Sequence, residues 1–134
     1  MKRSILLFVV FIFSGCATIA EAPKSVIGIS TRDVDKVRAS AATGVFQGDF
    51  TNIYDAVLAV AKESSFYVFS QDEVRGVIVL MNIPGYVDTT EVGVFISPLK
   101  SGEFKVEVSS RSSPAREDVA KIILGKLEEK YKKI

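Results

Sequence analysis

The hydrophobic and polar positions from residue 43 onward predict a small domain with two helices and four or five strands. Apolar residues at 53, 57, 60 and 61 recur at the spacing of one helix face, and those from 119 to 131 do the same. Between these helices the pattern changes to β-type runs, and in the last run Phe104, Val106 and Val108 alternate with charged residues. The predicted strands are 45–46, 66–70, 77–83, 90–97 and 103–109, and the predicted helices begin at Asn52, capped by Thr51, and at Pro114, capped by Ser113.

The order of these elements predicts a fold class. Strand, helix, four strands in meander order and a closing helix (β-α-β-β-β-β-α) form an antiparallel sheet of 4–5 strands with both helices on one face. This is an α+β two-layer sandwich. We place Val106 of the last strand and Ile123 of the last helix in its core, facing each other.

The N-terminal end of the chain has a different character. Lys2 and Arg3 precede nine unbroken apolar residues, 5–13, and two small residues follow. A nine-residue helix rises only about 13 Å, against a hydrocarbon core of roughly 30 Å. The pattern therefore predicts a removable export signal over residues 1–15.

The end of this signal, Phe13-Ser14-Gly15-Cys16, resembles the lipobox of bacterial lipoproteins. The resemblance implies cleavage before Cys16 and attachment of acyl chains to its thiol as a lipid anchor. In that family Asp after the cysteine is associated with inner-membrane retention, and this chain has Ala17. The resemblance thus implies the periplasmic leaflet of the outer membrane. We divide the chain into the signal peptide (1–15), the lipidated Cys16 with a tether (16–42), and the α+β domain (43–134).

The run Gly48-Asp49-Phe50-Thr51-Asn52-Ile53-Tyr54-Asp55-Ala56-Val57, together with the element order, carries a second resemblance. It is similar to the helix-grip or TATA-binding-protein-like arrangement of small periplasmic lipoproteins, including the BamC-like domains of the outer-membrane assembly machine. That family offers no catalytic residues to transfer to this sequence.

Composition narrows the possible chemistry. The chain has 17 basic and 16 acidic residues, and loss of Lys2 and Arg3 with the signal leaves 15 basic against 16 acidic, which gives no electrostatic case for nucleic acid. There is no histidine, so the commonest general base and the usual zinc ligand are missing. Cys16 is the only cysteine, so no internal disulfide forms. We expect no metal and no cofactor.

The sheet carries more apolar residues than one core face needs. In the run 77–81 both alternating sets are apolar, so one of them must lie on the face away from the helices. If Val94 and Ile96 face the helices, Phe95 points away from them. By the same parity Tyr67 and Phe69 point away when Phe66 and Val68 point inward.

An open face bearing Tyr67, Phe69 and Phe95 would be a contiguous apolar patch, which is typical of a partner surface. Tyr86, in the loop 83–89, is a further candidate for recognition. Two alternatives stay open: the N-terminal segment, through Val26, Ile27 and Ile29, covers the patch, or a small hydrophobic ligand binds.

These observations favour a non-enzymatic outer-membrane lipoprotein whose periplasmic domain binds another envelope protein or a second copy of itself. The alternative is a binding module for a lipid or other apolar ligand held between helices and sheet. Enzymatic activity is the least supported of the three hypotheses.

Overall fold

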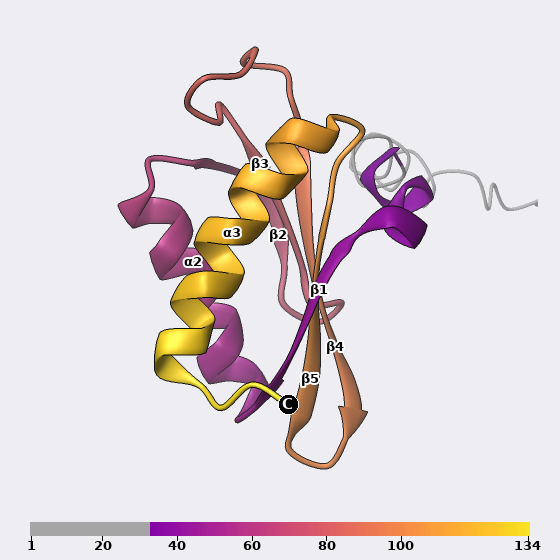
Figure 1. Ribbon diagram of the computed structural model, residues 1–134, viewed down its shortest axis with the longest axis vertical. Coiled ribbons are helices and arrows are strands. Elements are labelled where there is room, and N and C mark those ends of the chain that lie inside the picture. Colours follow the sequence, from indigo (N-terminus) through magenta and orange to yellow (C-terminus); the bar gives the residue numbers. More distant parts are fainter. Residues whose placement is uncertain (1–32) are drawn as a thin grey trace, which may run out of the picture.

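A computed structural model describes residues 33–134, which form a five-stranded antiparallel sheet with two long helices on one face (Figure 1). The element order and the α+β two-layer class are those predicted from the sequence. The elements are a 3-10 turn η1 (Arg38–Ser40), β1 (Ala42–Gln47), α2 (Phe50–Glu63), β2 (Tyr67–Asp72), β3 (Val77–Met81), β4 (Val92–Lys100), β5 (Glu103–Ser109) and α3 (Ser113–Lys130).

The strands lie in the order β1-β5-β4-β3-β2, with every neighbouring pair antiparallel. The outer edge of β1 is occupied by the C-terminal residues. The N–H of Gln47 donates to the carbonyl of Lys132 at 2.9 Å, and the N–H of Ile134 donates to the carbonyl of Val45 at 2.9 Å. β2 is the opposite edge of the sheet.

The main core fills the layer between the helices and the sheet. Val106 and Ile123 are both fully buried in it, as the sequence predicts. Ile78 and Leu80 of β3 belong to the same core, so they are the set that faces the helices. Burial of side chains of this size contributes about 1.5–3 kcal/mol each.

The helix N-termini differ from the prediction by one or two residues. The carboxylate of Asp49, rather than Thr51, caps α2 and accepts a hydrogen bond from the N–H of Asn52 at 3.4 Å. Ser112, rather than Ser113, caps α3. In both cases the cap is the residue whose backbone is still extended, as capping geometry requires.

Two strand ends also differ. β4 continues to Lys100, although Pro98 was expected to end it, because the pairing with β3 stops at Phe95 and the proline nitrogen lies on the side of β4 that no other described strand borders there. β3 ends at Met81 instead of Ile83, because the next residue, Asn82, has a positive φ of 50° that breaks the extended run.

Residues 33–40 correct the predicted domain boundary. We assigned them to the tether, but they pack against the sheet on the face opposite the helices, and Val34 is only 1% exposed. Residues 33–36 are helical and η1 follows. We call residues 33–40 the strap. The folded domain therefore includes the strap as well as residues 43–134.

Candidate functional site

The strand register decides which side chains share the face opposite the helices. Val77 pairs with Phe95, and Val77, Val79 and Phe95 form a hydrophobic cluster separate from the main core. The predicted parity of Phe95 is therefore correct. Its predicted exposure is wrong, because only 4% of Phe95 is accessible.

The strap is what covers Phe95. Val34 completes the cluster with Val77, Val79 and Phe95. Gly93 makes room for it, because a Cβ at this position would lie 2.8 Å from Cγ2 of Val34. A segment N-terminal to β1 thus covers the centre of the sheet face opposite the helices. This resembles the first alternative, in which the N-terminal segment covers the patch. The segment named for that role, Val26 to Ile29, lies outside the described residues, as does Cys16.

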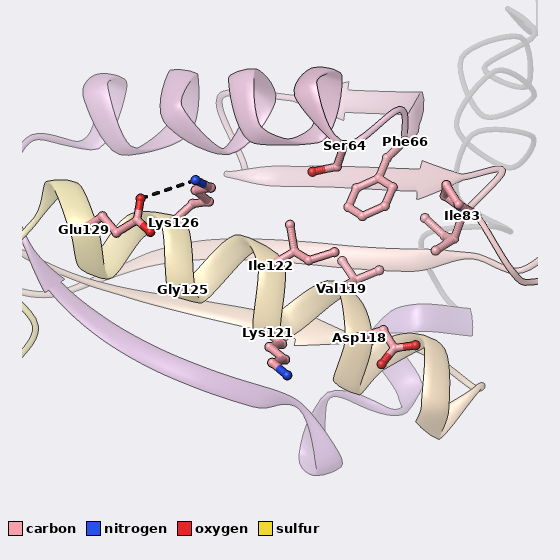
Figure 2. A pocket seen from close by; sticks show the side chains of 11 residues that line it. Ser64, Phe66, Ile83, Asp118, Val119, Lys121, Ile122, Gly125, Lys126 and Glu129 are labelled. Carbon is pink, nitrogen blue, oxygen red and sulfur yellow. Dashed lines mark hydrogen bonds and ion pairs between the residues drawn. The ribbon is translucent and has the colours of Figure 1, made fainter.

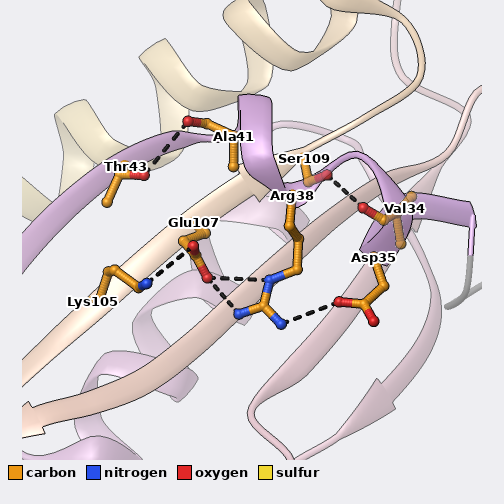
Figure 3. Close-up of polar contacts among 8 residues, drawn as sticks. All are labelled: Val34, Asp35, Arg38, Ala41, Thr43, Lys105, Glu107 and Ser109. Atoms are coloured by element: carbon orange, nitrogen blue, oxygen red, sulfur yellow. Dashed lines mark hydrogen bonds and ion pairs between the residues drawn. The ribbon is translucent and has the colours of Figure 1, made fainter.

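Polar contacts hold the strap in place (Figure 3). The hydroxyl of Ser109 donates to the carbonyl of Val34 at 2.6 Å. The guanidinium of Arg38 donates to the carboxylate of Glu107 through Nε at 3.2 Å and through Nη2 at 2.5 Å. The same guanidinium lies 4.2 Å from the ring centroid of Phe95, a cation–π contact. The Nζ of Lys105 approaches Glu107 to 3.2 Å.

These contacts predict that acid loosens the strap. Burial raises the pKa of Glu107, but hydrogen bonds and charges from Arg38 and Lys105 outweigh it and hold the pKa below its ordinary value of 4.5. A carboxyl with a depressed pKa contributes stability above its unfolded pKa and loses it as the pH falls through the folded-state pKa. We expect the strap amides to lose hydrogen-exchange protection as the pH falls below about 4.5, after correction for intrinsic exchange rates.

A Glu107→Gln variant is the control for this effect. It retains hydrogen-bonding capacity but does not titrate, so its strap protection should be weaker at neutral pH and should not fall with acid. Equal acid responses of the two proteins would contradict the assignment of the effect to Glu107.

Two of the predicted aromatic anchors are accessible. Tyr67 is 57% exposed and pairs with Met81, which places it on the face opposite the helices. Phe69 is 49% exposed and is the extra residue of a bulge between Val68 and Ser70. Both belong to β2, an edge strand that has no second neighbouring strand among residues 33–134. The structure therefore retains an aromatic pair at one edge and not the three-residue patch that we expected.

Tyr86 makes structural contacts and is not a freely exposed side chain available for recognition. It is half-buried, packs against the main core, and donates a hydrogen bond from its hydroxyl to the carboxylate of Asp118 on α3. That bond raises the pKa of Tyr86, because loss of the phenolic proton would break the hydrogen bond and place a second negative charge beside Asp118. Tyr86 thereby ties the β3–β4 loop to α3.

A groove along α3 was not foreseen from the sequence (Figure 2); its other wall is the segment that follows α2 and the start of the β3–β4 loop. Its volume is about 740 Å³, and Phe66, Ile83, Val119 and Ile122 provide its apolar walls. Ile122 is 38% exposed although it belongs to the apolar stripe of α3. Periodicity assigned it to the core, but Ile122 lines the groove, and the spacing of the segments that form the groove has no signal in a single sequence.

Comparison with protein-family models finds none that matches this chain, and comparison with curated protein sequences finds no significant relative. Within residues 33–134 no helix has the length and apolar character needed to cross a membrane. Over the same residues, no group of three or more histidine, cysteine or acidic side chains is arranged to hold a metal ion.

Proposed function

We propose that this chain is a lipid-anchored, non-enzymatic protein of the bacterial outer membrane whose periplasmic domain binds another envelope protein. The observation that carries the binding role is the pair of exposed aromatic side chains, Tyr67 and Phe69, on the edge strand β2, whose outer side no other described residue pairs with. Tyr and Phe bury large apolar areas at small entropic cost, and they are enriched in the centres of protein interfaces.

The anchoring role rests on the sequence alone. The export signal and the lipobox resemblance at Cys16 support attachment to the periplasmic leaflet, and two or more acyl chains suffice for stable anchoring at about 0.8 kcal/mol per buried methylene. The strap begins 17 residues after Cys16, so the intervening chain has ample contour length, at most about 3.6 Å per residue, to hold the domain clear of the bilayer surface.

The anchor is tested by Cys16→Ser. We expect the variant to take up no label from a fatty-acid analogue and to accumulate with its signal uncleaved, because only the thiol accepts the diacylglyceryl group. The wild-type chain is the labelled reference. Label in the variant at the wild-type level would rule out Cys16 as the anchor.

The binding role is tested by truncating the exposed pair. We expect the double variant Tyr67→Ala/Phe69→Ala to melt nearly normally, because exposed side chains contribute little to stability. Its crosslinked partner should be lost, since truncating a central aromatic anchor costs on the order of 2 kcal/mol or more of binding. Crosslinking in envelope membranes followed by purification measures this.

Leu99 offers a matched control for that experiment. It is also apolar and exposed, at 52%, but lies in the bulge at the end of β4. Leu99→Ala should leave the crosslinked partner in place. A partner that survives the double variant, or that is lost equally in Leu99→Ala, would move the binding surface away from Tyr67 and Phe69.

A second candidate function is suggested by the groove along α3. Its volume of about 740 Å³ lies in the range of pockets for small ligands, and its walls are largely apolar. If a lipid or similar apolar ligand binds there, native mass spectrometry of the purified full chain should detect it. Ile122→Lys, which places a charge on the accessible wall, should abolish the adduct without affecting partner crosslinking.

A further inference from the structure

We propose that the free edge of β2 and the adjoining side of α2 bind a short, extended peptide of a partner protein. This peptide has apolar side chains at alternating positions and an acidic side chain that meets Lys62. The inference rests on the proposed binding function and specifies the chemistry of the partner segment.

The first support is the backbone of β2. One side of this strand is paired with β3, and among residues 33–134 no backbone hydrogen bond joins its outer side to another segment. An edge strand presents alternating N–H and C=O groups that an extended peptide can pair with. The opposite edge of the sheet, β1, is already occupied by the C-terminal residues.

The second support is a groove beside that edge. It has a volume of about 520 Å³ and lies between α2 and β2, with Leu58, Phe66 and Val68 as apolar lining. Val68 pairs with Leu80, which places both on the helix side of the sheet. A peptide strand added to β2 sends alternate side chains to this side, into the groove, and the others to the face that carries Tyr67.

The third support is charge. Lys62, near the C-terminus of α2, is exposed and is the only charged residue that lines this groove. Among the described residues it has no ion-pair partner within 4.0 Å. The remaining lining residues are neutral: Ser65, Tyr67, Gln71 and Asn82. A single unpaired ammonium on an otherwise neutral, partly apolar groove is complementary to one carboxylate on the ligand.

The bulge in β2 favours a short peptide over a second copy of the chain. At Phe69 the bulge breaks the regular spacing of outward backbone groups, so a long strand cannot pair continuously along the edge. Such breaks are a common protection against edge-to-edge self-association. A segment of a few residues can still pair on one side of the bulge.

The experiment uses the mature full chain in lipid nanodiscs, with empty nanodiscs for counter-selection, and a phage-displayed library of random dodecapeptides as the probe. Selected peptides are synthesised and titrated against the protein. We expect alternating apolar residues with an Asp or Glu among them. We also expect binding to be abolished by N-methylation at one set of alternate peptide nitrogens and to tolerate methylation at the other set.

Charge reversal provides the matched pair of variants. Lys62→Glu should weaken the selected peptides at least ten-fold, and Lys121→Glu, the same change at an exposed position on α3, should leave their affinity within two-fold. Addition of a peptide should shift the NMR signals of β2 and of α2 near Leu58.

The proposal is overturned if no peptide is enriched, if the enriched peptides are indifferent to N-methylation, or if the two lysine variants behave alike. A chain that sediments as a dimer dissociated by Phe69→Lys would assign the edge to a second copy instead. If the peptide criteria fail while Tyr67→Ala/Phe69→Ala still abolishes partner crosslinking, the binding function stands and only this mode of recognition is wrong.

Discussion

Replacing Val106 with Asp is expected to unfold the domain. Val106 is fully buried between the sheet and the helices, and the described core around it is apolar. A carboxylate there has no partner, so it must either desolvate its charge or take up a proton, and either costs several kcal/mol. Small domains are stable by only about 5–15 kcal/mol, so the variant should lose cooperative melting or most of its melting temperature. Ile123→Asp, on the opposite wall of the same core, should behave alike.

Val74→Asp is the matched control for both changes. Val74 is 99% exposed in the β2–β3 turn, so the same chemical change there removes no buried contact. Thermal unfolding followed by circular dichroism should show a wild-type transition for Val74→Asp. Near-normal melting of Val106→Asp or Ile123→Asp would contradict the packing of α3 on β5.

The second large effect concerns the strap. Val34→Asp should detach residues 33–40 while the rest of the sandwich remains folded, because the strap packs outside the main core. Loss of the buried Val34 side chain removes about 1.5–3 kcal/mol, and the new carboxylate adds a desolvation penalty. Hydrogen exchange should show loss of protection in the strap, and a hydrophobic dye should bind the newly exposed Val77, Val79 and Phe95.

Gly93→Ala tests the same contact from the other side. The added Cβ lies 2.8 Å from Val34 and 2.9 Å from the ring of Phe95, so it should displace the strap although the change adds one methyl group. Gly125→Ala is the control, because a Cβ at position 125 meets no atom within 4 Å and the strap should stay in place. Gly102→Ala is less suitable, because the backbone φ of Gly102 is +75° and an alanine there is strained. A strap that stays protected in both Val34→Asp and Gly93→Ala would show that Val34 does not hold it.

Burial of Phe95 also changes the expected effect of truncating it. A side chain that faces Val34 and Arg38 contributes to packing, so Phe95→Ala should lower the melting temperature. An exposed binding residue would leave the melting temperature almost unchanged. The loss of a partner in this variant therefore reports destabilisation of the covered face and carries no information about an interface at Phe95.

The pattern of apolar and polar residues predicted a helix or strand well where a single physical rule determined it. The alternation in residues 103–109 defined β5 to the residue, because one face of that strand is apolar and the other polar. The parity of Phe95 followed from its neighbours Val94 and Ile96, because successive side chains of a strand point to opposite faces of the sheet. The helix caps were missed by one or two residues, because Asp49 and Ser112 stand beside other capping residues and the backbone decides between them.

The covering of the second sheet face was not predictable from local pattern, because it depends on contacts between residues far apart in the sequence. The run 77–80 is apolar at every position, and the structure explains this, because the helices bury Ile78 and Leu80 and the strap buries Val79 and most of Val77. The run indicated that apolar side chains lie on both faces of the sheet, and we expected the second face to be an open partner surface, with cover by an N-terminal segment as an alternative. Val34 is one of only a few apolar residues in a largely polar stretch, and the pairing of Arg38 with Glu107 spans 69 positions.

The candidate binding surface was predicted in part. Tyr67 and Phe69 are accessible, whereas Phe95 is covered and Tyr86 is held by Asp118. The two grooves, one along α3 and one between α2 and β2, depend on the spacing of packed elements, for which a single sequence has no signal. Lys62 became a candidate binding residue only when the structure placed it beside the edge strand β2.

The most direct test of a binding surface at the β2 edge is site-specific photocrosslinking in living cells. A photoreactive phenylalanine analogue is placed at position 69, and in separate strains at positions 95 and 74. We predict that the analogue at position 69 forms a discrete crosslinked product with an envelope protein. We predict no such product from position 95, beneath the strap, or from position 74, in the exposed turn. Products of equal yield from positions 69 and 74, or a product from position 95 alone, would contradict this account.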